Sequence, residues 1–69
     1  MKLIDLISVI HKDYIVTLEV YNKYGYETTY RVDLETERNI LNPKYRDAMV
    51  MNVESKGKGK INIVVELDD

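Results

Sequence analysis

Ser8 and His11 have the side-chain types that nucleophilic catalysis uses, and they lie three positions apart. A histidine activates a hydroxyl by accepting its proton across a hydrogen bond, and this spacing would place both side chains on one face of a helix. The chain has one other serine, Ser55, and neither a second histidine nor a cysteine. Because a catalytic triad needs more than this pair offers, we favour a solvent-exposed helix edge.

Asp33, Glu35 and Glu37 alternate along the chain and could converge on a divalent cation. However, the glycine and the fixed spacing of oxygen ligands in a calcium loop are missing. With no cysteine and one histidine, a structural zinc site would need three carboxylates, which is unusual. No glycine-rich segment opens a helix to hold a phosphate group. We therefore expect a solvent-exposed strand end, no metal, no cofactor and no enzymatic activity.

A lysine-rich stretch at residues 56–60 contains two glycines and lies between two apolar runs. Lys56, Lys58 and Lys60 could contact the phosphates of a nucleic acid, but so few charges would give a weak, salt-sensitive interaction. No aromatic residue lies between them to stack on a base. Glycine suits a hairpin turn, and lysine keeps such a turn soluble. The stretch favours a turn, and nucleic-acid binding stays open as an alternative.

The chain has six tyrosines but no phenylalanine and no tryptophan. The alternating pattern of residues 14–34 predicts that the covered face of a sheet includes Tyr14, Tyr26 and Tyr30. Tyrosine is frequent among the residues that dominate protein–protein binding, although single exposed apolar residues are also common on surfaces. Val50 is expected on the outer face of the sheet. The candidate partner-binding residues, on that face or at the first turn, are Ile15, Tyr21, Tyr24 and Val64.

The length of 69 residues predicts a single domain, 1–69, with a small core. Small cores are often supported by disulfides, metals or oligomerisation, and without cysteine a homo-oligomer, in particular a homodimer, is the expected support. The net charge of −2 gives no general attraction to nucleic acid or anionic membrane. Asp5 interrupts the first apolar run, and no run is long enough to span a membrane. We expect a soluble cytoplasmic protein.

The first half of the chain changes from helical to strand periodicity. Apolar residues at helical spacing predict a short helix over 2–10. From Tyr14 to Leu34 the period is two, interrupted at residues 22–25. A three-residue loop, 23–25, keeps like faces opposite each other and places Gly25 where a left-handed backbone is needed. The expected pairs are Val20 with Thr28, Leu18 with Tyr30 and Val16 with Val32.

The second half predicts a helical turn and another hairpin. Asn42 is a good helix N-cap and Pro43 a good first helical residue, so we expect one turn to Asp47. Its apolar anchors are expected to be Ile40, Leu41 and Tyr45. The runs 48–54 and 60–67 read as strands joined by a loop at 57–59, with Gly59 left-handed. The expected pairs are Val53 with Ile63 and Met51 with Val65, with Met49, Met51 and Val53 forming the more continuous apolar face.

Together these elements predict an α+β fold. An N-terminal helix packs on an antiparallel sheet of about four strands, built from two hairpins that a short helical turn joins. Parity and turn chemistry decide the pairing within each hairpin. They leave the order of the strands between hairpins open.

The segment 3–20 resembles the start of many small bacteriophage and prophage proteins, in which a short helix runs through an aspartate–tyrosine pair into the first strand. It is similar in particular to the start of a prophage-encoded anti-CRISPR family that inhibits Cas9. The matching residues are Asp5, Leu6, Ile7, Ile10, Lys12, Asp13, Tyr14, Val16 and Leu18. The stretches NPKYRDA and INIVVEL complete an outline similar to that of short phage proteins. The resemblance implies a phage-like accessory protein that acts by binding.

Three functions follow as hypotheses. The first is a small, non-enzymatic, phage-like binding protein that inhibits a host protein such as a defence nuclease. The second is a small nucleic-acid-binding or regulatory protein that uses the lysine-rich hairpin. The third is a structural homo-oligomer.

Overall fold

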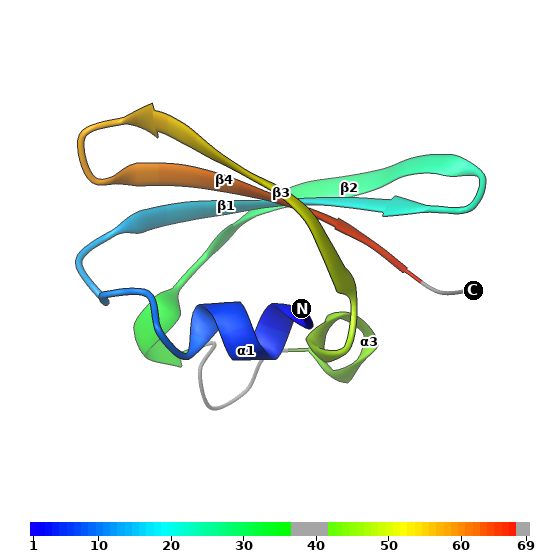
Figure 1. Ribbon diagram of the computed structural model, residues 1–69, viewed down its shortest axis with the longest axis horizontal. Coiled ribbons are helices and arrows are strands. Elements are labelled where there is room, and N and C mark those ends of the chain that lie inside the picture. The colour runs from blue at the N-terminus through cyan, green and yellow to red at the C-terminus, as the bar shows by residue number, and fades with distance from the viewer. Residues whose placement is uncertain (37–41, 68–69) are drawn as a thin grey trace.

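The computed structural model describes residues 1–36 and 42–67 as two layers, with a four-stranded sheet above and short helical segments below (Figure 1). The elements are α1 (Leu3–Ile7), β1 (Ile15–Asn22), β2 (Gly25–Val32), α3 (Pro43–Arg46), β3 (Met49–Gly57) and β4 (Lys60–Glu66). The helical segments lie on one side of the sheet, so the fold is α+β as the sequence predicts.

The sheet is mixed, with strand order β2-β1-β4-β3. Each hairpin is antiparallel, but its central pair, β1 with β4, is parallel. The expectation of an antiparallel sheet is therefore wrong at its centre. A parallel pair requires a long crossover connection, and here β2 and β3 lie on opposite edges, joined by a connection whose described parts lie on the helical side (Figure 1).

Helix α1 is shorter than the predicted helix over 2–10 and ends at Ile7. Beyond it the amides of Val9 and Ile10 donate to carbonyls three residues back, as in a 3₁₀ turn. The Ser8 hydroxyl donates to the Asp5 carbonyl at 2.9 Å, a local bond that competes with regular helix. Two β-branched residues follow, and they lose side-chain freedom in a helix. Local chemistry thus ends the helix early.

The core lies between the sheet and the helical layer. Leu3 and Ile7 of α1 are fully buried against the inward side chains of the sheet. Burying such an aliphatic side chain contributes about 1.5–3 kcal/mol. The other buried apolar residues are Val16, Leu18, Val20, Val32, Leu34, Ala48, Ile63, Val65 and Leu67.

The first hairpin has the predicted pairs, Val20 with Thr28, Leu18 with Tyr30 and Val16 with Val32. Its turn differs, because Asn22 pairs with Gly25 across two residues and a bulge near Val20 restores the register. Gly25 has the expected positive φ, +122°. One residue has moved from the loop into the strand, and Tyr26 therefore turns to the outer face and is 62% exposed. The predicted placement of Tyr26 on the core face is wrong.

Of the other tyrosines assigned to the covered face, one is placed as predicted. Tyr30 is half-buried and packs against the core, with its ring 5.9 Å from that of Tyr45. Tyr14 precedes β1 and is 44% exposed, so its assignment is wrong. The alternating pattern extends one residue beyond the point where the strand begins, which is why parity misplaced Tyr14.

The second hairpin has the predicted pair of Val53 with Ile63, and Gly59 has φ +71° as expected. A bulge between Val50 and Asn52 changes the register, so Val50 rather than Met51 faces Val65. Val50 packs against the core, and its predicted place on the outer face is wrong. The expected apolar face of Met49, Met51 and Val53 is also not a core face, since each is about half exposed.

The helical turn α3 is as predicted. The Asn42 side chain accepts from the Lys44 amide at 2.9 Å, and Pro43 is the first helical residue. Tyr45 packs against the core as an anchor. The other two expected anchors, Ile40 and Leu41, lie outside the described residues.

Candidate functional site

The side of the sheet that faces away from the helical layer is left uncovered by the described part of the chain (Figure 1). We call it the open face. Strand register places its residues in rows that run across β2, β1, β4 and β3. One row is Arg31, Thr17, Asn62 and Glu54; the next is Thr29, Glu19, Val64 and Asn52; the third is Tyr26, Tyr21, Glu66 and Met49.

A polar network fills the middle of the open face. The Thr17 hydroxyl donates to Asn62 Oδ1 at 2.6 Å, across the parallel pair. Asn62 Nδ2 donates to Glu19 Oε1 at 3.4 Å and to Glu54 Oε1 at 3.3 Å. These neighbours cover Asn62 so well that it is 5% exposed. Buried amides are costly unless they are hydrogen-bonded, so the network holds these side chains in one arrangement.

Two tyrosines stand beside this network. The rings of Tyr21 and Tyr26 pack edge to face, with centroids 5.8 Å apart. The Tyr21 hydroxyl donates to Glu19 Oε2. This hydrogen bond, with a smaller contribution from desolvation, raises the pKa of Tyr21 above its ordinary value. The aromatic pair is therefore oriented by the same carboxylate that binds Asn62.

The predicted partner-binding residues are only partly brought together. Ile15, Tyr21 and Val64 point to the open face, where Ile15 is 38% exposed. Tyr24 instead lies in the first turn, 87% exposed, with the Lys23 ammonium 5.2 Å from the centre of its ring.

Sequence reasoning missed two exposed apolar residues of the open face. These are Tyr26 and Met49, both of which lie past a bulge from the regular register. Alternation carries no signal for a bulge, because the extra residue inverts the apparent parity beyond it. Asn62 could have been noticed as a polar residue among apolar neighbours in the last strand.

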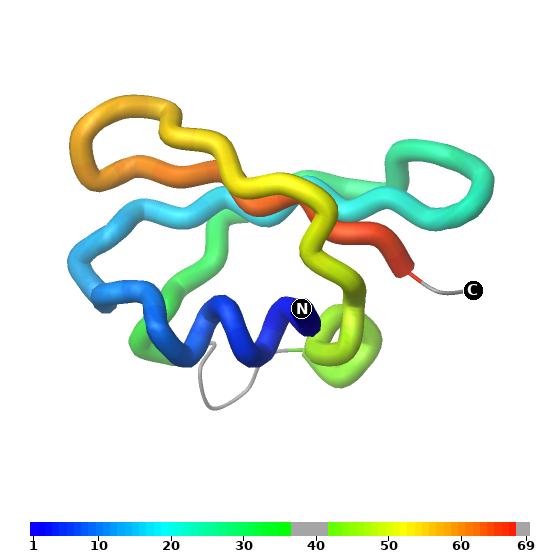
Figure 2. Tube along the Cα trace, in the orientation of Figure 1, coloured from blue at the N-terminus to red at the C-terminus, as the bar shows by residue number. Residues whose placement is uncertain are grey.

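The lysine-rich stretch forms the turn between β3 and β4. Lys58 lies in the turn, Lys56 stands 3.8 Å from Glu54, and Lys60 lies beside Ile15 on the open face. All three lysines are exposed. The amide of Ile15 donates to the carbonyl of Gly59 at 2.8 Å. The turn is thereby joined to the start of β1 (Figure 2).

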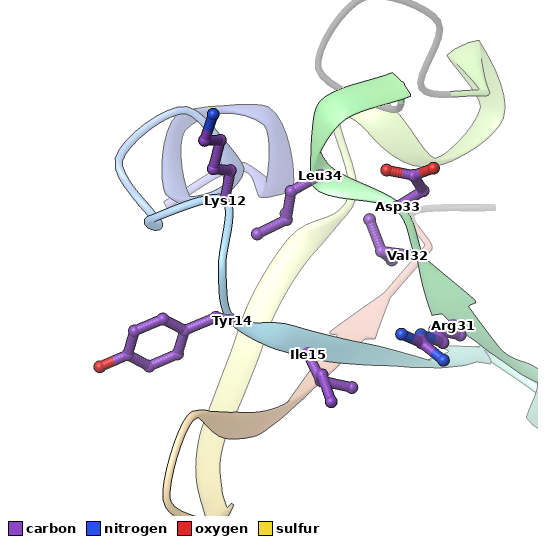
Figure 3. Close-up of a pocket in the computed structure, with 7 residues that line it drawn as sticks. All are labelled: Lys12, Tyr14, Ile15, Arg31, Val32, Asp33 and Leu34. Atoms are coloured by element: carbon purple, nitrogen blue, oxygen red, sulfur yellow. The ribbon is translucent and has the colours of Figure 1, made fainter.

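A shallow hollow of about 340 Å³ lies at this same end of the sheet. Its lining comes from the loop before β1, the end of β2 and the residues that follow (Figure 3). The ammonium group of Lys12 points away from Arg31, and Tyr14 points outward beyond the strand (Figure 3). In small-molecule sites a few polar groups point toward a common centre. The polar side chains that line this hollow do not, so it does not resemble such a site.

Asp33, on the rim of the hollow, caps a helical segment that begins at Leu34. Its carboxylate accepts from the amides of Glu35 and Thr36 and from the Thr36 hydroxyl. These bonds, the Thr36 amide foremost, lower the pKa of Asp33 below its ordinary value. Asp33, Glu35 and Glu37 are the three carboxylates that the sequence could bring to one cation. Asp33 instead accepts hydrogen bonds from the backbone, and Glu37 lies outside the described residues. The described residues contain no cluster of groups that could hold a metal ion.

Ser8 and His11 each bond to nearby groups. The Ser8 hydroxyl donates to the Asp5 carbonyl, and His11 Nδ1 accepts from the Asp13 amide at 3.2 Å. A catalytic histidine accepts a hydrogen bond from the hydroxyl that it activates. Here the Ser8 hydroxyl and His11 Nδ1 instead form hydrogen bonds with the nearby backbone.

No helix in the described part of the chain is long and apolar enough to cross a lipid bilayer. Comparison with family models, curated proteins and solved structures finds no match to this chain.

Proposed function

We propose that this chain is a small, non-enzymatic, phage-like binding protein whose docking surface is the open face. Its expected action is to inhibit a host protein, such as a defence nuclease, by occupying a surface that protein needs. The resemblance of residues 3–20 to phage and anti-CRISPR proteins supports the phage setting. The observation that carries the proposal is the uncovered sheet face with its exposed aromatic and apolar residues.

One part of the open face has the residue types that protein-binding surfaces favour. Exposed Tyr26 and Met49 lie in one row with Tyr21, and Ile15 stands at the other end of β1. Tyrosine is enriched among binding hot spots because it offers a rigid apolar ring and a polar tip. The hydrogen-bonded network around Asn62 holds the middle of the face in place before any partner arrives, which lowers the entropy cost of docking.

The experiment compares two exposed apolar residues on opposite sides of the molecule. Tyr26 is on the open face, while Val9, 76% exposed, follows α1 on the helical side. A photo-crosslinking amino acid is placed at either position, and the protein is produced in host cells. We expect a discrete covalent adduct from position 26 and none from position 9. Equal adducts from both positions, or none from either, would contradict docking through the open face.

An inhibition assay tests the nature of the partner. The protein is added to an RNA-guided host nuclease and the cleavage of target DNA is measured. We expect wild type and Val9→Lys to slow cleavage, and Tyr26→Lys to lose the effect. If the adduct from position 26 contains a protein other than a nuclease, the binding proposal stands and the nuclease is excluded as its partner.

A further inference from the structure

The parallel pairing of β1 with β4 brings together positively charged residues from the two hairpins. It brings the lysine-rich turn beside the segment that enters β1, and the end of β2 lies on the other side of β1 (Figure 2). Lys60 pairs with Ile15, the Gly59 carbonyl accepts from the Ile15 amide, and Arg31 lies one row further along the open face. We call this region the basic end. Its residues are Lys12, Tyr14, Ile15, Arg31, Lys56, Lys58 and Lys60.

The basic end has more positive charge than its nearby carboxylates balance. Among the described residues, its five cations have three carboxylates beside them. Glu54 contacts Asn62 and Lys56, Asp33 accepts from backbone amides, and Asp13 lies 3.5 Å from His11. In the described part of the chain, neither Lys58 nor Lys60 forms an ion pair. With a net charge of −2 overall, the remainder of the chain is acidic. A polyanion would therefore meet this end first.

An aromatic side chain lies at the start of β1, two residues after Lys12 and next to Ile15, the pairing partner of Lys60. Tyr14 is 44% exposed and points outward at the start of β1 (Figure 3). Ile15, 38% exposed, follows it beside Lys60. Two objections to nucleic-acid binding, too few charges and no ring to stack on a base, hold for residues 56–60 alone. The fold reduces both, since it places Arg31 one row from Lys60 and places Tyr14, with Lys12 two residues before it, next to the partner of Lys60.

We propose that the basic end binds single-stranded nucleic acid, with its cations along the phosphates and a base stacked on Tyr14. Stacking requires a base whose face is free, and a single strand has such bases whereas a duplex does not. Helices α1 and α3, with five and four residues, are too short to read a major groove, and neither contributes a residue to the basic end. This site adjoins the docking surface of the preceding section and shares Ile15 with it. The two are tested at different residues, Tyr14 here and Tyr26 there, so either can fail without the other.

The test is fluorescence anisotropy with a labelled DNA strand of about 15 nucleotides, at salt from about 50 to 200 mM. Wild type should bind with affinity that falls as salt rises, with a log–log slope of up to about −3.5 for five phosphate contacts. Changing Lys56, Lys58 and Lys60 together to Gln should flatten the slope by about two units. The matched control changes Lys2, Lys23 and Lys44 to Gln, which gives the same net charge and should leave the slope unchanged.

Tyr14 separates a nucleic-acid site from a general polyanion site. Tyr14→Ala should weaken binding about tenfold at unchanged slope, because a stacked ring carries no charge. Tyr14→Phe keeps the ring and should bind like wild type. Circular dichroism spectra that match wild type show that each variant is folded.

Three outcomes would overturn the proposal. The first is the absence of binding at the lowest salt. The second is a duplex of equal length that binds more tightly than the single strand. The third is a poly-glutamate peptide that competes as well as the DNA, together with no effect of Tyr14→Ala, which would assign the basic end to an acidic protein partner.

Discussion

The side chains of Thr17 and Asn62 form a hydrogen bond across the parallel strands β1 and β4, in which Thr17 Oγ1 donates to Asn62 Oδ1 at 2.6 Å. These strands come from different hairpins, so the bond joins the two halves of the chain on the open face. The inner faces of the same strands are joined by buried aliphatic side chains. Apolar packing alone would specify the alignment of these two strands only loosely. The Thr17–Asn62 hydrogen bond therefore helps to fix the register of β1 against β4.

The first prediction concerns Asn62. Asn62→Ala removes the acceptor of Thr17 and a donor to two carboxylates, and it should lower the free energy of unfolding by about 1–3 kcal/mol. Asn52→Ala is the matched control, since Asn52 is on the same face but is exposed on the edge strand β3. Its effect should stay within about 0.5 kcal/mol. Urea denaturation measures both, and equal losses would show that the network adds no stability.

The second prediction concerns Gly59, whose φ is +71°. A Cβ built there would meet nothing within 4 Å, so any cost of substitution comes from the backbone alone. Gly59→Val should destabilise the protein by about 1–2 kcal/mol, because side chains, and β-branched ones above all, disfavour the left-handed region. Lys58→Val, at the neighbouring turn position with ordinary φ, should cost far less. Similar denaturation midpoints for the two variants would contradict the left-handed turn.

The fold shows which parts of the structure local sequence could predict. Alternation and turn glycines correctly predicted the pairing of Leu18 with Tyr30 and of Val53 with Ile63. They failed for Tyr26 and Met51, because a bulge adds one residue and reverses parity beyond it. Bulges depend on how a strand twists against its neighbours, which a single strand's sequence does not encode.

The strand order was beyond local reasoning for a similar physical cause. Within a hairpin, a short loop forces neighbouring strands to be antiparallel. Between hairpins, the long connection permits β4 to lie beside β1 in either direction, and the packing of the whole core decides. For this reason Ile15 and Val64 were predicted on the outer face, but their neighbours across the parallel pair, Lys60 and Glu19, were not. The juxtaposition of Lys60 with Ile15 arises only from the parallel pair.

The third prediction concerns acid stability and Asp33. Helix amides lower the pKa of this carboxylate in the folded state. A depressed folded pKa contributes stability above the unfolded pKa of about 3.9, and this stability is lost as pH falls through the folded value. Asp33→Asn keeps a capping oxygen but no charge. Wild type should therefore be more stable than Asp33→Asn near neutral pH, and the gap should close in acid. A gap that stays constant from pH 7 to about 2.5 would contradict the assignment.

The last prediction concerns assembly and rests on the open face. A chain of 69 residues has a small core, and in the absence of another partner a second copy is the simplest way to cover an exposed apolar surface. We expect the sedimentation coefficient to rise with concentration from that of the 8.1 kDa monomer toward that of a dimer. The thermal midpoint should rise with concentration too, because association stabilises the folded state.

Two substitutions, Tyr26→Lys and Val9→Lys, show which surface forms the contact between the two copies. Tyr26→Lys places a charge beside Tyr21 on the open face, and it should hold the protein as a monomer at every concentration. Val9→Lys makes the same kind of change on the helical side and should dimerise like wild type. If both variants dimerise, the copies meet through another surface, such as the edge of β3. A wild-type monomer whose melting is independent of concentration would remove self-association and leave the open face to a different partner.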